Sequence, residues 1–324
     1  MLYPLKFKPV FKDKIWGGNR IQDKLGLDFS PLPNCGEAWA LSGVSECQTV
    51  VANGFLAGND LNEILEIYMD ELVGESVYER HKNEFPILVK FIDANDWLSI
   101  QVHPNDELAA SRRIGNGKTE MWYILDADQG AELISGFNRE MEKETYLKFV
   151  KENRLKEILN VEQVKRGDVF FIPAGRIHAL GPGILLAEIQ QTSDTTYRIY
   201  DWDRVDLSGN SRDLHTQLAV DAIDFSTYES YRTSYNPIIN RVTPVVNSRY
   251  FTTNLLIFNK KTEKDYSDLD SFVIYICVEG DILVTTEQGN CQFAKGEIIL
   301  LPAITEIVSL ATTSESKILE VYIS

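Results

Sequence analysis

The sequence predicts a mainly β protein made of two jelly-roll β-barrels with a few inserted helices. Short runs rich in β-branched and aromatic residues make up most of the chain, and Gly, Pro, Asn and Asp separate them. Two segments have the spacing of an amphipathic helix, and one strand-and-turn unit occurs twice. Many short strands with regular turn signals favour a sandwich or a jelly-roll barrel over a doubly wound sheet.

The two helical segments are expected at residues 59–84 and 138–160. In the first, apolar residues recur three and four positions apart, and Asn59 or Asp60 is a suitable N-cap. In the second, apolar residues again share one face, while Glu and Lys form a solvated opposite face. Both segments are therefore expected to be amphipathic helices.

The remaining ordered segments are expected to be strands. In the first part of the chain they lie at residues 87–92, 97–102, 121–125, 168–172 and 184–190. From residue 252 the pattern is almost entirely β, with strands expected at 254–258, 271–278, 280–286, 296–301 and 317–323. The first fifty residues mix short β-type runs with turn residues.

One internal repeat supports two related barrels. Residues 164–180 (VKRGDVFFIPAGRIHAL) resemble residues 293–310 (FAKGEIILLPAITEIVSL). The matched positions are Gly167, Asp168, Pro173 and Ala174 with Gly296, Glu297, Pro302 and Ala303. Such a unit begins a barrel hairpin and then turns the chain back. His178 has its counterpart at Ile307, so we expect a metal in the first barrel and a structural second barrel.

Length and charge set further limits. At 324 residues the chain exceeds the usual size of one domain, and we expect a catalytic barrel with helical insertions at 1–245 and a degenerate barrel at 246–324. The net charge of −16 disfavours a nucleic-acid-binding protein, which would present a basic surface. It also repels phosphorylated substrates, so a phosphate site would need a local cluster of Lys and Arg.

The cysteines and the hydropathy pattern predict a soluble cytoplasmic protein. Cys35, Cys47, Cys277 and Cys291 are scattered without a CxxC pair, which fits a reducing compartment better than a disulfide framework. The first residues lack the apolar core of a secretion signal, and no stretch approaches the length of a membrane-spanning helix.

The first candidate metal ligands lie in the segment SIQVHP. Alternate residues of a strand point to the same face, so Gln101 and His103 project together, and Pro104 ends the strand. An amide oxygen and an imidazole a few ångströms apart suit a hard or borderline ion. A single His at a strand end is more often a hydrogen-bonded structural residue, so this pair is weak evidence alone.

Two further segments add candidate ligands. Lys118 and Glu120 share one strand face, and Glu120 is flanked by apolar residues, where a carboxylate is usually paired or metal-bound. The alternative is a surface ion pair between Lys118 and a neighbour. His178 follows a barrel turn, where the alternative is a histidine of the apolar core. His81 and His215 lie in charged or polar segments without such a context.

Together these residues predict a catalytic metal site. One Gln, two His and one Glu give neutral nitrogen and oxygen ligands with a single carboxylate. Such a set leaves room for water or substrate, unlike a closed site of four cysteines. Beyond His178, Glu188 and Asp194 supply acids and Arg198 supplies a fixed cation. The alternative for Arg198 is structural stacking and pairing with Asp201.

Six segments resemble the type I mannose-6-phosphate isomerases, a zinc-dependent family of cupin barrels, in its shorter bacterial form. They are WGG (16–18), GEAWALS (36–42), LVKFIDANDWLSIQVHP (88–104), GKTEMWYIL (117–125), FIPAGRIHAL (171–180) and TYRIYDW (196–202). The segments occur in the order of the family and at compatible spacing. The resemblance is weak beyond residue 250.

The resemblance implies one zinc ion per chain and names its ligands. These are Gln101, His103, Glu120 and His178. It implies an active-site role for Arg198, with Lys90 and Lys118 lining the pocket, and substrate contacts from Ser99, Lys118, Arg198, Lys90 and Trp16. The expected partner is a small phosphosugar, without nucleic acid or membrane, and the expected state is a monomer or weak homo-oligomer.

The implied reaction interconverts mannose 6-phosphate and fructose 6-phosphate through a cis-enediol. Charge on the oxygen next to the reacting carbon would be stabilised by zinc and by Arg198 or Lys118. Candidates for the base are Glu188, Asp194, Lys118 and a zinc-bound water, and cationic neighbours would lower the pKa of Lys118. The rival interpretations are a cupin dioxygenase, which would present an iron-binding His and carboxylate triad, and a sugar-binding cupin without turnover.

Overall fold

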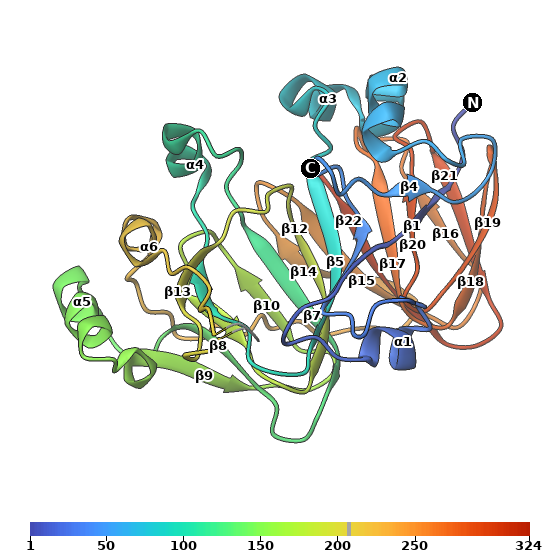
Figure 1. The fold of residues 1–324 in the computed structure, drawn as a ribbon. Helices are drawn as coiled ribbons and strands as arrows, with labels where there is room; N and C mark the ends of the chain where they lie inside the picture. The colour runs from blue at the N-terminus through green and yellow to red at the C-terminus, as the bar shows by residue number, and fades with distance from the viewer. Residues whose placement is uncertain (206–208) are drawn as a thin grey trace.

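The computed structural model describes residues 1–205 and 209–324 and confirms the mainly β fold (Figure 1). Its strands form four antiparallel sheets of seven, six, five and four strands. The six- and five-stranded sheets, on the left and in the centre of Figure 1, are formed by strands between residues 10 and 200, called here the first half of the fold. The second half, coloured orange to red, supplies most of the other two.

The two sheets of the first half contain all five strands expected there, although the strand expected at 97–102 begins only at Ile100. The six-stranded sheet has the order β10 (Val169–Ile172), β7 (Glu120–Ala127), β12 (Ile184–Gln191), β5 (Ile87–Ala94), β3 (Glu37–Leu41) and β2 (Val10–Lys12). The five-stranded sheet has the order β13 (Tyr197–Tyr200), β6 (Ile100–Val102), β11 (His178–Leu180), β8 (Glu132–Phe137) and β9 (Leu159–Gln163).

The sheets of the second half also include strands from the N-terminus. The seven-stranded sheet has the order β14 (Arg241–Asn247), β15 (Thr252–Phe258), β22 (Ser316–Tyr322), β17 (Val273–Glu279), β20 (Ile298–Leu301), β1 (Leu5–Lys8) and β4 (Val50–Val51). The four-stranded sheet has the order β16 (Thr262–Asp265), β21 (Ile307–Thr312), β18 (Asp281–Thr286) and β19 (Gly289–Ala294). The domain boundary expected at 245/246 falls within β14. The division into two domains stays a prediction.

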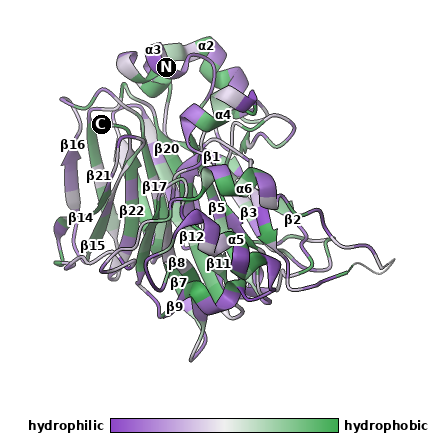
Figure 2. Ribbon diagram, turned by 90° about the vertical axis from the view of Figure 1, so that its left-hand side faces the viewer, coloured by the Kyte–Doolittle hydropathy of each residue, from purple (hydrophilic) through white to green (hydrophobic). Residues whose placement is uncertain are grey.

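Apolar cores lie between successive sheets. Val89 of β5 and Ile274 of β17 belong to one buried cluster, which joins the six- and seven-stranded sheets. Trp122 of β7 and Leu180 of β11 belong to another, between the six- and five-stranded sheets. In Figure 2 the hydrophobic colour is concentrated on the strands, whereas helices carry both colours, as expected of elements that pack by one face. The candidate site lies beside the second of these cores.

The helices lie at the periphery of the sheets (Figure 1). They are α1 (Arg20–Leu25), α2 (Leu61–Val73), α3 (Glu75–His81), α4 (Asp106–Arg112), α5 (Lys143–Lys151), α6 (Thr216–Ala222) and the 3-10 helix η1 (Leu155–Ile158). Helices α5 and α6 cover the outer face of the five-stranded sheet through a common apolar cluster. None of the helices in the described part of the chain combines the length and apolarity needed to cross a membrane.

The first predicted helix is confirmed at its start and is interrupted in its course. Asp60 is the N-cap: its Oδ1 accepts hydrogen bonds from the backbone N of Asn62 (2.9 Å) and Glu63 (3.0 Å). The Glu63 carboxylate accepts one from Asp60 N in return, which completes a capping box. The expected single helix 59–84 is wrong, because Gly74 at φ 96° separates α2 from α3. The second predicted helix is also shorter than expected, since 138–160 contains α5, η1 and the start of β9.

The internal repeat corresponds to two equivalent strand–turn–strand units, β10 with β11 and β20 with β21. The expected hairpins are wrong, because the two strands of each unit lie in different sheets. His178 is the first residue of β11, and its counterpart Ile307 is the first residue of β21. The repeat therefore places the histidine of the first barrel and the isoleucine of the second at the start of the second strand of each unit.

Candidate active site

Two rows of side chains face each other across the space between the five- and six-stranded sheets. In the five-stranded sheet, Gln101 pairs with His178 on one side and with Arg198 on the other. In the six-stranded sheet, Glu120 pairs with Gln190, and Glu188 pairs with Lys90. Because side chains at paired positions point to the same face, strand register aligns the groups within each row, and the packing of the two sheets brings the rows together.

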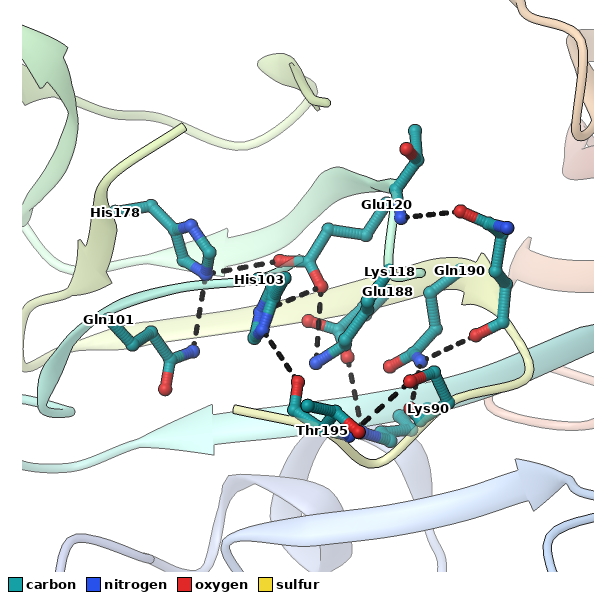
Figure 3. Close-up of polar contacts among 12 residues, drawn as sticks. Lys90, Gln101, His103, Lys118, Glu120, His178, Glu188, Gln190 and Thr195 are labelled. Carbon is teal, nitrogen blue, oxygen red and sulfur yellow. Dashed lines mark hydrogen bonds and ion pairs between the residues drawn. The ribbon is translucent and has the colours of Figure 1, made fainter. Parts of the chain in front are cut away.

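Three of the predicted metal ligands converge, as Figure 3 shows. His178 Nε2 lies 3.4 Å from Glu120 Oε1, and His103 Nε2 lies 3.5 Å from Glu120 Oε2. The three side chains are buried, and one ligand atom from each lies within 4.8 Å of the others. Ligands at about 2.0–2.2 Å from a tetrahedral ion are about 3.3–3.6 Å apart, so the spacing suits a small divalent metal.

The outer ring nitrogens fix how the two imidazoles are protonated. His103 Nδ1 lies 2.9 Å from the carbonyl oxygen of Thr195, and His178 Nδ1 lies 2.9 Å from that of Arg176. A carbonyl oxygen only accepts hydrogen bonds, so each Nδ1 carries the proton and donates it. Each Nε2 therefore directs a lone pair towards Glu120, and the two backbone carbonyls orient the rings, as hydrogen-bond acceptors commonly do for metal-binding histidines.

The electrostatics and the hydrogen-bond inventory also fit a cation. Burial, with the Lys118 ammonium nearby, lowers the pKa of His103 well below its usual value, and burial lowers that of His178 to about 4, so both are neutral. His103 Nε2 and both Glu120 carboxylate oxygens are buried without a hydrogen-bond partner among the described residues. Unsatisfied buried acceptors are costly, and a metal ion would satisfy them.

The fourth predicted ligand lies beside the other three. The side-chain amide of Gln101 is 3.2 Å from His178 Nε2. Rotating an amide by 180° exchanges its nitrogen and oxygen, so Gln101 can present its oxygen to an ion held at this point. The donor set of one amide oxygen, two imidazoles and one carboxylate suits zinc or another borderline divalent ion.

Two lysines each lie next to a carboxylate: Lys118 next to the ligand Glu120, and Lys90 next to Glu188 (Figure 3). Lys118 Nζ lies 3.2 Å from Glu120, and Lys90 Nζ lies 3.4 Å from Glu188 Oε1. Trp122 Nε1 donates a 2.9 Å hydrogen bond to Glu188 Oε2. All four charged side chains are buried, so the alternative of a surface ion pair for Lys118 is wrong.

These neighbours decide which groups are charged. Burial favours neutral Lys118, but Glu120 and Glu188 outweigh it and raise the pKa of that ammonium. The protein groups around Lys118 therefore raise its pKa, whereas cationic neighbours were expected from the sequence to lower it. Burial likewise favours neutral Glu188, yet Lys118 and Lys90 lower its pKa, so Glu188 is ionised. Burial and the charge of Glu188 raise the pKa of Glu120 to about 7.

A cavity of about 300 Å³ opens directly onto these groups. Its lining includes every residue predicted to bind substrate or to catalyse, together with two of the ligands: Trp16, Lys90, Ser99, Gln101, Lys118, His178, Glu188, Asp194 and Arg198. His103 and Glu120 are not part of the lining and are almost wholly buried. A small molecule in the cavity would thus meet two of the ligands and five cationic side chains, which are Lys14, Lys90, Lys118, Arg198 and Arg212.

Comparison with known proteins identifies the family. The sequence model of the phosphomannose isomerase type I catalytic domain matches residues 4–135, and that of the mannose-6-phosphate isomerase cupin domain matches residues 241–322. The mannose-6-phosphate isomerase ManA of Bacillus subtilis is 37% identical over 302 residues, which cover 92% of this chain and 93% of that protein. The chain belongs to the type I phosphomannose isomerases.

Further relatives agree with this assignment. A mannose-6-phosphate isomerase of Streptococcus mutans is 36% identical over 93% of both chains. The crystal structure of the Bacillus subtilis mannose 6-phosphate isomerase superimposes with a TM-score of 0.89 at 32% identity, covering 99% of this chain and 100% of that one. The apo form of the Salmonella typhimurium mannose 6-phosphate isomerase has the same fold, with a TM-score of 0.77 at 17% identity and complete coverage of both chains.

The contacts of Arg198 differ from those expected if its role were only structural. Asp201 pairs with Arg204 (2.8 Å) and Arg212 (2.5 Å). Arg198 instead lines the cavity, donates to the Asp213 carbonyl (2.9 Å) and has a buried Nε without a partner among the described residues. The alternative in which Arg198 pairs with Asp201 is therefore wrong.

The cavity also contains charged groups that the sequence did not single out. Arg212, Lys14 and Glu37 line it. Burial alone would raise the pKa of Glu37, but Lys90, Lys14 and a hydrogen bond from Trp39 lower it to about 2. Glu37 lies in GEAWALS, where an acid at the start of an apolar strand was an available signal. Arg212 lies in a polar segment without periodicity, so nothing in the sequence pattern marked it.

His215, which had no evident role in the sequence, supports Arg198. Its Nδ1 accepts a 3.1 Å hydrogen bond from Arg198 N, and its own N donates one of 2.7 Å to Arg198 O. His215 therefore holds the backbone of the strand that presents Arg198 to the cavity.

Proposed function

We propose that this site interconverts mannose 6-phosphate and fructose 6-phosphate through a cis-enediol, with one zinc ion per chain. The observation that carries the proposal is one cavity lined by a cluster of lysines and arginines and by Gln101 and His178, with His103 and Glu120 clustered next to His178. The relatives named mannose-6-phosphate isomerase support the choice of substrate.

The metal would be held by Gln101, His103, Glu120 and His178. A zinc ion bound there would act as a Lewis acid, polarising the sugar oxygen next to the reacting carbon. Lys118 is protonated and lines the same cavity, so it donates hydrogen bonds to sugar oxygens as negative charge develops on them. The bound zinc ion and Lys118 would therefore both act on oxygens of the substrate.

Glu188 is the base that the structure favours. It is ionised, and its Oε1 is ion-paired with Lys90 Nζ at 3.4 Å but accepts no hydrogen bond from any described residue. A lone pair of that oxygen can therefore take the C2 proton and return it to C1. Trp122 and Lys90 hold the carboxylate from two sides. Asp194 lines the same cavity and is the alternative base.

The phosphate would bind where Arg198 and Arg212 both line the cavity. Paired guanidinium groups suit a phosphate dianion, because each can donate two parallel hydrogen bonds. Thr196 and Ser99 add hydroxyl groups to the same lining. This local cluster would offset the repulsion that a net charge of −16 exerts on a phosphorylated substrate.

A coupled assay tests the proposal. Mannose 6-phosphate is supplied to the purified protein, and the fructose 6-phosphate formed is converted to glucose 6-phosphate and detected. Turnover at typical enzyme rates, on the order of 1–10³ s⁻¹, is expected. Binding of the sugar phosphate without turnover would indicate a sugar-binding cupin, and oxygen uptake by the iron-loaded protein would indicate a dioxygenase.

A further inference from the structure

The segment that carries Lys118 is held by a polar network outside the cavity. The backbone N of Gly117 donates a 3.0 Å hydrogen bond to Asp106 Oδ1. The backbone N of Thr119 donates one of 2.9 Å to Gln191 Oε1, and Gln191 Nε2 donates one of 3.0 Å to Asp106 Oδ1. The two residues that flank Lys118 are thus fixed by a single pair of side chains, Asp106 and Gln191.

The backbone contacts of this segment are equally close. Lys118 N donates to the Pro104 carbonyl at 3.0 Å, directly after the ligand His103. A Cβ atom on Gly117 would lie 2.6 Å from Asp106 N, so the chain at 117 rests against the start of α4 and a side chain would force it away. The position of Lys118 relative to His103 therefore depends on the contact of Gly117 with Asp106.

The same network reaches other strands of the site. Gln191 N donates to Thr119 O at 3.1 Å, and Gln191 ends β12, the strand that carries Glu188. Thr119 Oγ1 accepts a 3.2 Å hydrogen bond from Ala174 N, in the turn that leads to His178. A shift of residues 117–119 would consequently displace parts of three strands of the site, β7, β11 and β12.

Asp106 also connects this segment to the second half of the chain. Its other oxygen, Oδ2, accepts hydrogen bonds from Tyr250 OH (2.7 Å) and Arg249 Nη2 (2.9 Å). The inward bonds, from Gly117 and Gln191, use Oδ1, and the outward bonds, from Tyr250 and Arg249, use Oδ2. Variants can therefore remove one set and keep the other. The Arg249 side chain is 69% exposed, and its ion pair is expected to contribute little by itself.

We propose that Asp106, with Gln191, is a positioning residue for Lys118. It sets the distance of the Lys118 ammonium from Glu120 and from the sugar oxygens without touching the substrate. The inference rests on the proposed function, in which protonated Lys118 stabilises developing charge. Misplacing a catalytic group by about 1 Å can lower turnover by about 10²-fold, so the contribution of Asp106 is expected in kcat and much less in KM.

Three variants test the inference. Asp106→Ala removes both sets of hydrogen bonds, and Asp106→Asn keeps an Oδ1 acceptor for Gly117 and Gln191. Arg249→Ala removes an outward bond only and is the matched control. We expect kcat to fall about 10- to 100-fold in Asp106→Ala, with the metal content of the wild type, and to change less than about threefold in Asp106→Asn and Arg249→Ala. Equal losses in Asp106→Ala and Asp106→Asn would overturn the inference, as would an unchanged kcat in Asp106→Ala.

Hydrogen exchange measures the positioning itself. Peptides that cover residues 114–121 should exchange faster in Asp106→Ala than in Arg249→Ala, while the rest of the first half stays protected. If Asp106→Ala does not fold, Gln191→Met serves instead, because it frees only the Thr119 N–H and Asp106; unchanged kcat and exchange there would overturn the inference. Exchange is measured without substrate, so a chain with no isomerase activity would refute the proposed function and leave this readout intact.

Discussion

Arg212 offers a sharp test of the phosphate end of the site, because a neighbour with the same partner serves as its control. Arg212 donates to both oxygens of Asp201, at 2.7 and 2.5 Å, and lines the cavity. Arg204 also pairs with Asp201, at 2.8 Å, but does not line the cavity. In Arg212→Ala the Asp201 carboxylate keeps Arg204, so the fold should lose little while the cavity loses a cation.

The size of the effect follows from the exposure of the guanidinium. A hydrogen bond to a charged group contributes about 1.5–3 kcal/mol. The Arg212 side chain is 34% exposed, so solvent screening favours the lower half of that range. A loss of about 1.5–2 kcal/mol corresponds to a fall of roughly 10- to 30-fold in kcat/KM.

The coupled isomerase assay measures this loss for Arg212→Ala and Arg204→Ala side by side. We expect the fall in kcat/KM for the first variant, mainly through KM, and less than about threefold for the second. Competitive inhibition by inorganic phosphate should weaken by a similar factor in Arg212→Ala alone. If both variants lose the same activity, or if inhibition by phosphate is unchanged in Arg212→Ala, Arg212 has a structural role and the phosphate binds elsewhere.

Two further predictions concern buried carboxylates. Replacing the base in Glu188→Gln should lower kcat by about 10²-fold or more with unchanged metal content, measured by the same assay and by metal analysis; an equal loss of metal would instead indicate a structural effect. Burial, partly offset by Arg20, raises the pKa of Asp93 to about 6, so its proton is bound more tightly in the folded chain. The free energy of unfolding of the wild type, relative to Asp93→Asn, should therefore fall by up to about 3 kcal/mol as the pH rises from about 4 to about 6 and stay level above, in denaturant titrations. A pH-independent difference would contradict the assigned pKa.

Local sequence patterns predicted the parts of the site that depend on one strand. Alternation placed Lys118 and Glu120 on one face, and the structure confirms it with a 3.2 Å contact. The relation of Glu120 to His178 depends instead on how two sheets pack, which no local pattern encodes. It could be inferred only from residue chemistry and from the resemblance to a family.

Tertiary contacts explain what the patterns missed. The periodicity expected to give one helix at 59–84 is interrupted at Gly74, where a Cβ atom would lie 2.5 Å from the Asp270 carbonyl oxygen of the distant second half. The pairing of Asp201 with Arg212 rather than Arg198 likewise depends on a segment that has no periodic pattern. In both cases a long-range partner decides a question that neighbours in sequence leave open.

The most direct test of the central claim is a zinc titration of the metal-free protein followed by isomerase activity. Chelator-treated protein should be inactive, and activity should rise with added zinc and level off at one ion per chain. Glu120→Ala, which removes the only carboxylate among the four ligands, should bind zinc weakly and recover little activity. Full activity in protein shown by metal analysis to be metal-free would contradict the account.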